Sequence, residues 1–162
     1  MSQLLSRWPL FECDVRSMIS KVLLFIMLLM SSVAAISAQA REMRPAGVTV
    51  YGETLLAQIN QYRQEKGLNT LRFDPGLTQL AQNHSFAMFQ QKMLSHRNFQ
   101  DRFDRSGSHL CVENVGWNYT NPLKQFEGWR RSPDHNKNML TDGIQQAGIA
   151  EVGNYVTFFA CK

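Results

Sequence analysis

The stretch AGIAEVGNYVTFFAC, residues 147–161, contains two runs of β-branched and aromatic residues separated by Gly153-Asn154. Valine, isoleucine, threonine and aromatic side chains favour strands, and a glycine-asparagine pair is typical of the two-residue turn that joins antiparallel strands. The sequence therefore predicts a C-terminal β-hairpin, and with it an antiparallel sheet.

Three helices are predicted upstream of this hairpin. In residues 53–67, ETLLAQINQYRQEKG, apolar residues recur at helical spacing, and Gly67 suits the position after a last helical turn. The other two helices begin with an N-cap residue followed by proline, at Asp74-Pro75 and Asn121-Pro122. The helix after Asp74 has one apolar stripe, formed by Leu77, Leu80, Ala81, His84, Ala87 and Met88.

Between the second and third helices, residues 96–110 predict a loop with at most a short helix, and residues 110–119, LCVENVGWNY, predict a strand. The expected order is helix, helix, strand, helix, strand, strand. An order of this kind indicates an α+β domain in which helices cover an antiparallel sheet.

The N-terminal forty residues are typical of an export signal. Lys21 is followed by the uncharged segment VLLFIMLLMSSVAAISAQA, residues 22–40, and its last three residues fit the small-x-small rule for signal cleavage. Met18 is an alternative start that would leave a shorter leader before the apolar segment. We therefore expect a signal peptide over residues 1–40, a flexible lead-in over 41–50 and one domain over 51–162.

An uncleaved membrane anchor is the alternative, because the uncharged segment approaches the roughly 20 residues that a spanning helix needs. The serine- and alanine-rich second half of the segment favours cleavage. With either outcome, residues 41–162 are expected outside the cytoplasm, in a periplasm or the extracellular space. Membrane contact is expected only through the N-terminal segment.

Charge and cysteine content narrow the class of protein further. The net charge is only +4, and apart from Arg130-Arg131 the basic residues are scattered, which gives no basic face for nucleic acid. Cys13 would leave with the signal or stay on the cytoplasmic side, whereas Cys111 and Cys161 are exported. In an oxidising compartment we expect this pair to form a disulfide if their strands are neighbours. The alternative is two buried thiols.

The candidate chemistry involves histidines and one carboxylate. His96 follows the second helix, and His135 falls in the polar stretch SPDHNKNML, residues 132–140, where Pro133 is expected to stop the third helix. Glu113 lies in an apolar strand, where a carboxylate is costly to bury unless it is paired. It therefore faces a wet cleft or has a dedicated partner. If the three converge they could form a metal or acid–base site, but histidines that are simply packed are the alternative.

Five stretches, taken in order, resemble one family. They are residues 59–88 (INQYRQEKGLNTLRFDPGLTQLAQNHSFAM), 94–96 (LSH), 113–118 (ENVGWN), 128–140 (GWRRSPDHNKNML) and 147–160 (AGIAEVGNYVTFFA). Their order and spacing resemble the CAP superfamily of cysteine-rich secretory, antigen 5 and pathogenesis-related proteins, in its compact bacterial form. The resemblance implies a three-layer α-β-α sandwich with a small antiparallel sheet between helices.

The resemblance also implies a binding cleft. His96 and His135 match the two histidines of the family's cleft, and Glu113 matches the glutamate of the family's G-E-N motif. Val112 replaces the motif's glycine, and Ser132 stands near the place of a second glutamate that eukaryotic members have. Ser132 and His84 are expected beside the cleft, His84 more as a residue at the edge of the core than as a ligand. Glu127 is the one nearby candidate for the missing carboxylate, although nothing marks it as facing inward.

Three functions follow from these residues. The first is a binding module for a small molecule, lipid, protein or divalent metal such as zinc, with His96 and His135 as metal ligands and Glu113 orienting one imidazole. The second is a metal-assisted hydrolase, a peptidase or esterase, with Glu113 as catalytic base; a third zinc ligand is not evident in the sequence. The third is a purely structural envelope protein.

Overall fold

The computed structural model describes Ile19, residues 21–27 and residues 47–162. The predicted cleavage site, most of the lead-in and Cys13 lie outside these residues. Residues 21–27 are helical, and no helix in the described part of the chain has the length and apolar character that crossing a membrane requires. Residues 47–162 belong to one compact unit.

The sheet has four strands in the order β1-β3-β4-β2. The predicted hairpin is confirmed as β3 (Gln146–Val152) and β4 (Tyr155–Cys161), with Gly153 at a φ of +60° in the turn. Strand β2 (Cys111–Trp117) pairs antiparallel with β4 and forms one edge. The other edge is β1 (Arg72–Phe73), parallel to β3. Two residues are too short to show strand periodicity, so β1 was not predicted.

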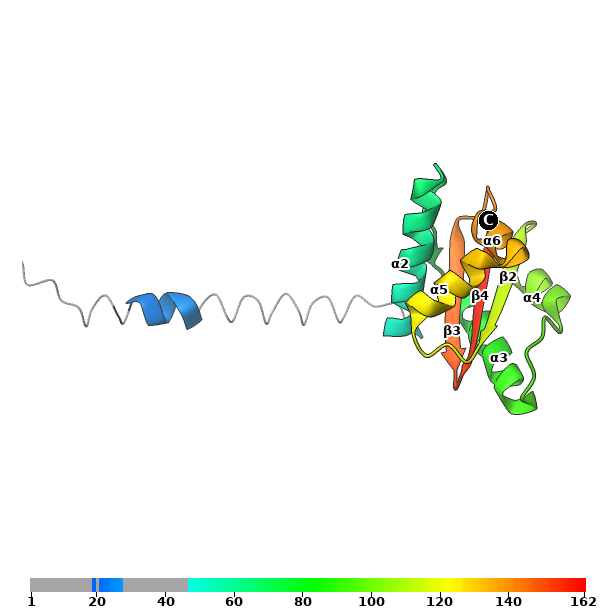
Figure 1. The fold of residues 1–162 in the computed structure, drawn as a ribbon, viewed down its shortest axis with the longest axis horizontal. Coiled ribbons are helices and arrows are strands. Elements are labelled where there is room, and N and C mark those ends of the chain that lie inside the picture. The colour runs from blue at the N-terminus through cyan, green and yellow to red at the C-terminus, as the bar shows by residue number, and fades with distance from the viewer. Residues whose placement is uncertain (1–18, 20, 28–46) are drawn as a thin grey trace, which may run out of the picture. The chain divides into compact units, whose positions relative to one another are not determined.

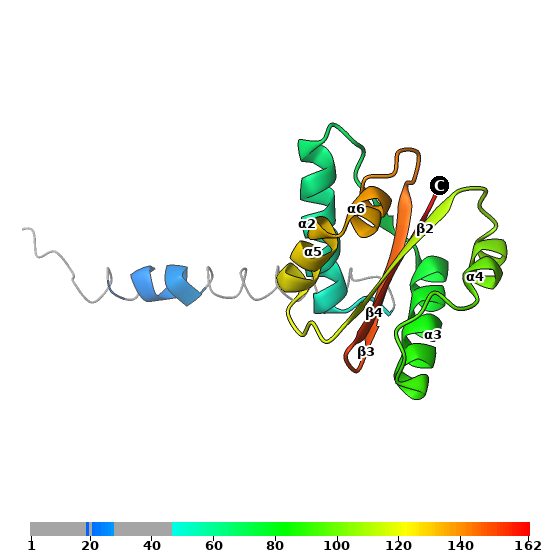
Figure 2. The same ribbon diagram turned by 45° about the vertical axis from the view of Figure 1, so that its right-hand side comes forward.

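Helices cover both faces of this sheet, which confirms the predicted α-β-α sandwich (Figures 1 and 2). Helices α3 (Pro75–Gln91) and α4 (Phe99–Ser106) lie on one side. Helices α2 (Val50–Glu65), α5 (Pro122–Arg131) and α6 (Pro133–Met139) lie on the other. The predicted caps are confirmed: Asp74 accepts from the N–H of Leu77 at 2.8 Å, and Asn121 accepts from that of Leu123 at 2.8 Å.

One local prediction was wrong. Pro133 does not simply stop a helix: α5 ends at Arg131, and Pro133 is the first residue of α6. Ser132 lies between the two helices in an extended conformation, as the residue before a proline should. His135 is therefore on a short helix and not in a turn.

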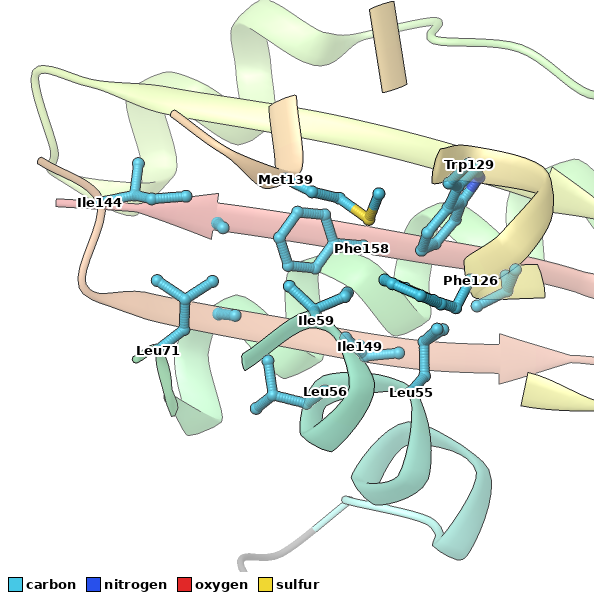
Figure 3. Packing of buried hydrophobic residues seen from close by; sticks show 13 residues of the cluster. Leu55, Leu56, Ile59, Leu71, Phe126, Trp129, Met139, Ile144, Ile149 and Phe158 are labelled. Atoms are coloured by element: carbon cyan, nitrogen blue, oxygen red, sulfur yellow. The ribbon is translucent and has the colours of Figure 1, made fainter. Parts of the chain in front are cut away.

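The main hydrophobic core lies between the sheet and the α2–α5–α6 layer. Figure 3 shows Phe158 of β4 among Ile59 of α2, Trp129 of α5 and Met139 of α6, all at most 2% exposed. A smaller cluster lies under α3. There Gly148 of β3 faces the backbone of Leu77 so closely that any side chain at position 148 would overlap it. Helix α3 is therefore seated directly on the sheet.

The disulfide between Cys111 and Cys161 is confirmed. The two residues face each other in the β2–β4 pairing, and their sulfur atoms are 2.07 Å apart. The bond therefore ties the edge strand β2 to the central strand β4, two residues before Glu113.

Candidate functional site

Glu113 is the centre of the polar site, and its side chain is only 1% exposed. Arg102 of α4 forms a two-point ion pair with it: the guanidinium donates from Nε to Oε2 at 2.7 Å and from Nη2 to Oε1 at 2.8 Å. Arg102 is itself buried. Of the two settings that the sequence left open for Glu113, the structure shows the dedicated partner.

The surroundings of Glu113 keep it ionised. Burial by itself would raise the pKa of this carboxyl group. The hydrogen bonds from His96 and Arg102, together with the positive charge of Arg102, outweigh burial and hold the pKa below its ordinary value. Glu113 is therefore a carboxylate at neutral pH and acts only as a hydrogen-bond acceptor.

His96 stands on the loop between α3 and α4, and its Nδ1 lies 2.9 Å from Oε1 of Glu113. Because the carboxylate can only accept, Nδ1 must carry the proton. In the neutral form of the ring, Nε2 is then the nitrogen that carries the lone pair. The side chain of His96 is 52% exposed, so this ring can meet a ligand from solution.

His135 is held beside β2 by an amide network. Asn114 donates to the main-chain carbonyl of His135 at 3.0 Å. Asn138 donates to the carbonyl of Glu113 at 2.9 Å and to Oδ1 of Asn114 at 3.0 Å. Burial lowers the pKa of His135, and the nearby His96 lowers it further. The ring of His135 is therefore neutral at pH 7.

Strand β2 explains how distant segments reach one place. Successive side chains of a strand point to opposite faces, so Glu113 faces the α3–α4 layer and Asn114 faces α6. As β2 is an edge strand, its outer carbonyls lack a strand partner. The side chain of Asn138 donates to the main-chain carbonyl of Glu113, and that of Trp129 donates to the main-chain carbonyl of Val115 at 3.0 Å. We call Glu113, Arg102 and His96, together with His135 of the opposite layer, the Glu113 cluster. His135 is linked to the other three through Asn114 of β2 and through its electrostatic interaction with His96.

The remaining candidates lie beside this cluster or away from it. His84 is buried on α3, donates to the carbonyl of Ser95 at 2.8 Å and stands 3.8 Å from Glu113. Ser132 is half-buried between α5 and α6 and makes no side-chain cap. Glu127 pairs with Arg130 at 2.9 Å on the exposed surface of α5, which removes it as the missing carboxylate. His109 is exposed, as expected for its loop.

The donor set for a metal is small. Within the described ranges, no three histidine, cysteine, aspartate or glutamate side chains converge as metal ligands. Both oxygens of Glu113 are engaged by Arg102, so this carboxylate is not available as a third ligand. The residues do not supply the three protein ligands of a typical catalytic zinc site.

The sequence prediction missed Arg102 and Asn114. Arg102 lies between Phe99 and Phe103 in a stretch that was expected to be mostly loop. Its position three residues after Phe99, about one helical turn, is the signal that could have placed both on the same helix face. Asn114 is 0% exposed, but a buried asparagine in a strand gives no sequence signal of its partner.

Two open surface hollows lie elsewhere on the domain. One of about 470 Å³ is lined by residues of α3, β2 and the β3–β4 turn, among them Phe89, Trp117 and Tyr155. Another of about 290 Å³ lies between α3 and α4, at Asp74 and Arg105. Trp117 is 50% exposed, whereas Trp129 is a core residue at 2%.

Acid should destabilise the domain in two stages. Burial lowers the folded-state pKa of His84 and of His135 from 6.5, so below that pH the unfolded chain binds more protons and stability falls as pH decreases. The lowered pKa of Glu113 adds stability that is present above 4.5 and lost below it. Urea unfolding at pH 7.5, 5.5 and 4 should show a falling free energy of unfolding at each step. An unchanged value between pH 7.5 and 5.5 would contradict this.

Known proteins give the same fold. The structure resembles that of an extracellular protein containing an SCP domain from Bacillus anthracis strain Ames, with 22% identity and a TM-score of 0.64. A cysteine-rich secretory protein from Staphylococcus aureus Mu50 is similar at 18% identity and a TM-score of 0.61. The matches cover 68% and 67% of this chain but only 39% and 36% of those proteins, so the chain spans well under two thirds of their length.

An outer surface protein from Borrelia burgdorferi is similar over 69% of this chain and 92% of its own, at 16% identity and a TM-score of 0.64. No curated protein matches the sequence. A sequence model of the cysteine-rich secretory protein family, CAP, matches residues 56–162, which is most of the chain and all of the Glu113 cluster. The chain therefore belongs to the CAP family.

Proposed function

We propose that this chain is an exported binding module that takes a divalent metal ion, or a ligand carrying one, through His96 and His135. The observation that supports this most strongly is the buried two-point pair between Arg102 and Glu113, with His96 bonded to the same carboxylate. In this arrangement Glu113 orients an imidazole, as outer carboxylates commonly do for metal-binding histidines.

The same pair argues against Glu113 as the base of a hydrolase. A general base must reach the proton it removes and must have a pKa near the working pH. The carboxylate of Glu113 is 1% exposed, both of its oxygens are engaged, and its pKa is held below the ordinary value. It is a poor proton acceptor for a bound water, and we therefore rank the hydrolase second.

Imidazole ligands suit a borderline metal such as zinc. The side chain of His96 is exposed, and the lowered pKa of His135 keeps that ring unprotonated, so protons compete little with a metal for His135 at pH 7. Zinc prefers four ligands, which leaves about two positions for water or for donor atoms of a partner molecule. Open positions of this kind are what a metal-bridged binding module needs.

Zinc titration of the full chain by calorimetry tests the proposal. We expect binding by the unmodified protein and a loss of at least about tenfold in affinity in His96→Ala and in His135→Ala. His109→Ala removes an exposed histidine outside the cluster and should leave affinity unchanged. Absence of binding by the unmodified protein, or an affinity in both cluster variants equal to that of the unmodified protein, would overturn the proposal.

An assay of ester and peptide hydrolysis distinguishes the binding module from the hydrolase. With zinc present, the unmodified chain should release no product from ester and peptide libraries. Hydrolysis that disappears in a folded Glu113→Gln variant would establish the hydrolase in place of the binding module. Hydrolysis retained in that variant would remove Glu113 from the chemistry but would still show an enzyme.

We also propose export with removal of residues 1–40. The support is the N-terminal sequence pattern, and two structural neighbours are described as extracellular or outer surface proteins. Mass spectrometry of the product from an expressing cell should give a chain that begins at Arg41 and has lost two hydrogens to the Cys111–Cys161 bond. A product that retains residues 22–40 would show an anchor instead.

A further inference from the structure

The loop that carries His96 has little burial of its own. Residues 92–94 and 96–98 are exposed, and the loop is bounded by Lys92 and Asn98, which both have a left-handed backbone with φ of +50° and +58°. At Lys92 this conformation ends α3, with N–H bonds from Lys92 to the carbonyl of Phe89 and from Met93 to that of Met88, and asparagine adopts it readily. Because most of the loop between these ends is exposed, hydrogen bonds and not apolar packing must fix it.

Two buried side chains hold the carbonyls immediately before and after His96. His84 lies 2.8 Å from the carbonyl of Ser95, and Arg102 donates from Nη1 to the carbonyl of Arg97 at 2.8 Å. Both come from helices, α3 and α4, that pack on the sheet. Arg102 also fixes Glu113, so its role at the site is already evident, whereas His84 belongs to neither the ion pair nor the two ligand imidazoles.

We propose that His84 is a positioning residue, which holds the Ser95 carbonyl so that His96 stands over Glu113 with Nδ1 protonated and Nε2 free. Only the expected effect on zinc affinity rests on the function proposed above. The expected effect on the orientation and tautomer of His96 does not, and it can be measured without metal.

The geometry identifies the donor of the hydrogen bond between His84 and Ser95. A carbonyl only accepts, so Nε2 of His84 is the donor and the proton on that nitrogen is fixed. The same nitrogen is 3.8 Å from Oε1 of Glu113, beyond hydrogen-bond distance, so His84 does not compete with His96 for the carboxylate. The side chain of His84 is buried, and rotation away from Ser95 would leave an unpaired polar group inside the protein.

Histidine ¹⁵N spectra of the full chain, which distinguish the two ring nitrogens, test this directly. In the unmodified protein His96 should be a single Nδ1-protonated tautomer. His84→Phe keeps a flat ring but has no donor, and His96 should become a mixture of tautomers, with zinc affinity lower by about tenfold. His84→Gln keeps a donor and should restore much of both readouts. His84→Leu replaces the phenylalanine variant if that one does not fold.

The matched control is Ser85→Ala. Ser85 is the next residue on α3, is 0% exposed, and bonds the carbonyl of Ala150 at 2.9 Å and the hydroxyl of Thr157 at 2.8 Å, on the sheet side. Its loss should lower stability without changing the His96 tautomer. The proposal is overturned if His84→Phe leaves the His96 spectrum unchanged, or if Ser85→Ala alters it equally. If the unmodified chain binds no zinc, only the metal function fails, because the tautomer measurement still decides the role of His84.

Discussion

Glu113→Gln is expected to lower the free energy of unfolding by about 3–5 kcal/mol, since removing one partner of a buried ion pair leaves the other charge uncompensated. Arg102 would keep its charge inside the protein with only the Arg97 carbonyl and a neutral amide as acceptors. Urea unfolding at pH 7.5 would measure the loss. Zinc binding at the proposed site should weaken as well, because His96 loses its ionised acceptor.

A double-mutant cycle makes this prediction specific. Arg102→Met combined with Glu113→Gln should cost clearly less than the sum of the single variants, because no buried charge remains. Glu127→Gln, which breaks the exposed pair with Arg130, serves as the control and should cost at most about 1 kcal/mol. Additive losses in the cycle would mean that Arg102 and Glu113 do not act as a pair.

Loss of the disulfide is expected to cost about 4 kcal/mol on the loop-closure estimate, because the bond closes a loop with a sequence separation of 50 residues. The bond also joins β2 to β4 two residues before Glu113, so the start of β2 should become the least protected part of the strand when it is absent. Unfolding with and without reductant, and hydrogen exchange along residues 111–117, would measure both effects.

The variant with both cysteines changed to serine provides the comparison for the reduced protein. The two should be equally destabilised, because each lacks only the covalent link. Reduction without any change in stability would show that the bond contributes nothing to the folded domain. A loss confined to the variant would instead point to the packing of Cys161, which is only 2% exposed.

Local signals explain the parts of the fold that the sequence predicted well. The Gly153-Asn154 turn, the Asp74-Pro75 and Asn121-Pro122 helix starts and the strand around Glu113 each depend on residues close together in the chain. Turn and cap preferences act over a few residues, so a single sequence contains them. The family resemblance added what such signals lack, namely which distant segments lie together.

The sequence by itself determined that Glu113, in an apolar strand, needed either water or a partner, and that two histidines flanked it along the chain. Only the tertiary structure decided that the partner is Arg102. It also decided that Asn114 and Asn138 hold α6, and with it His135, beside β2. The hydrogen bond between His84 and the carbonyl of Ser95, next to His96, was likewise visible only there. The physical reason is that β2 is an edge strand between two helical layers. Its alternating side chains form hydrogen bonds with residues 11 to 24 positions away, which carry no local signal of that contact.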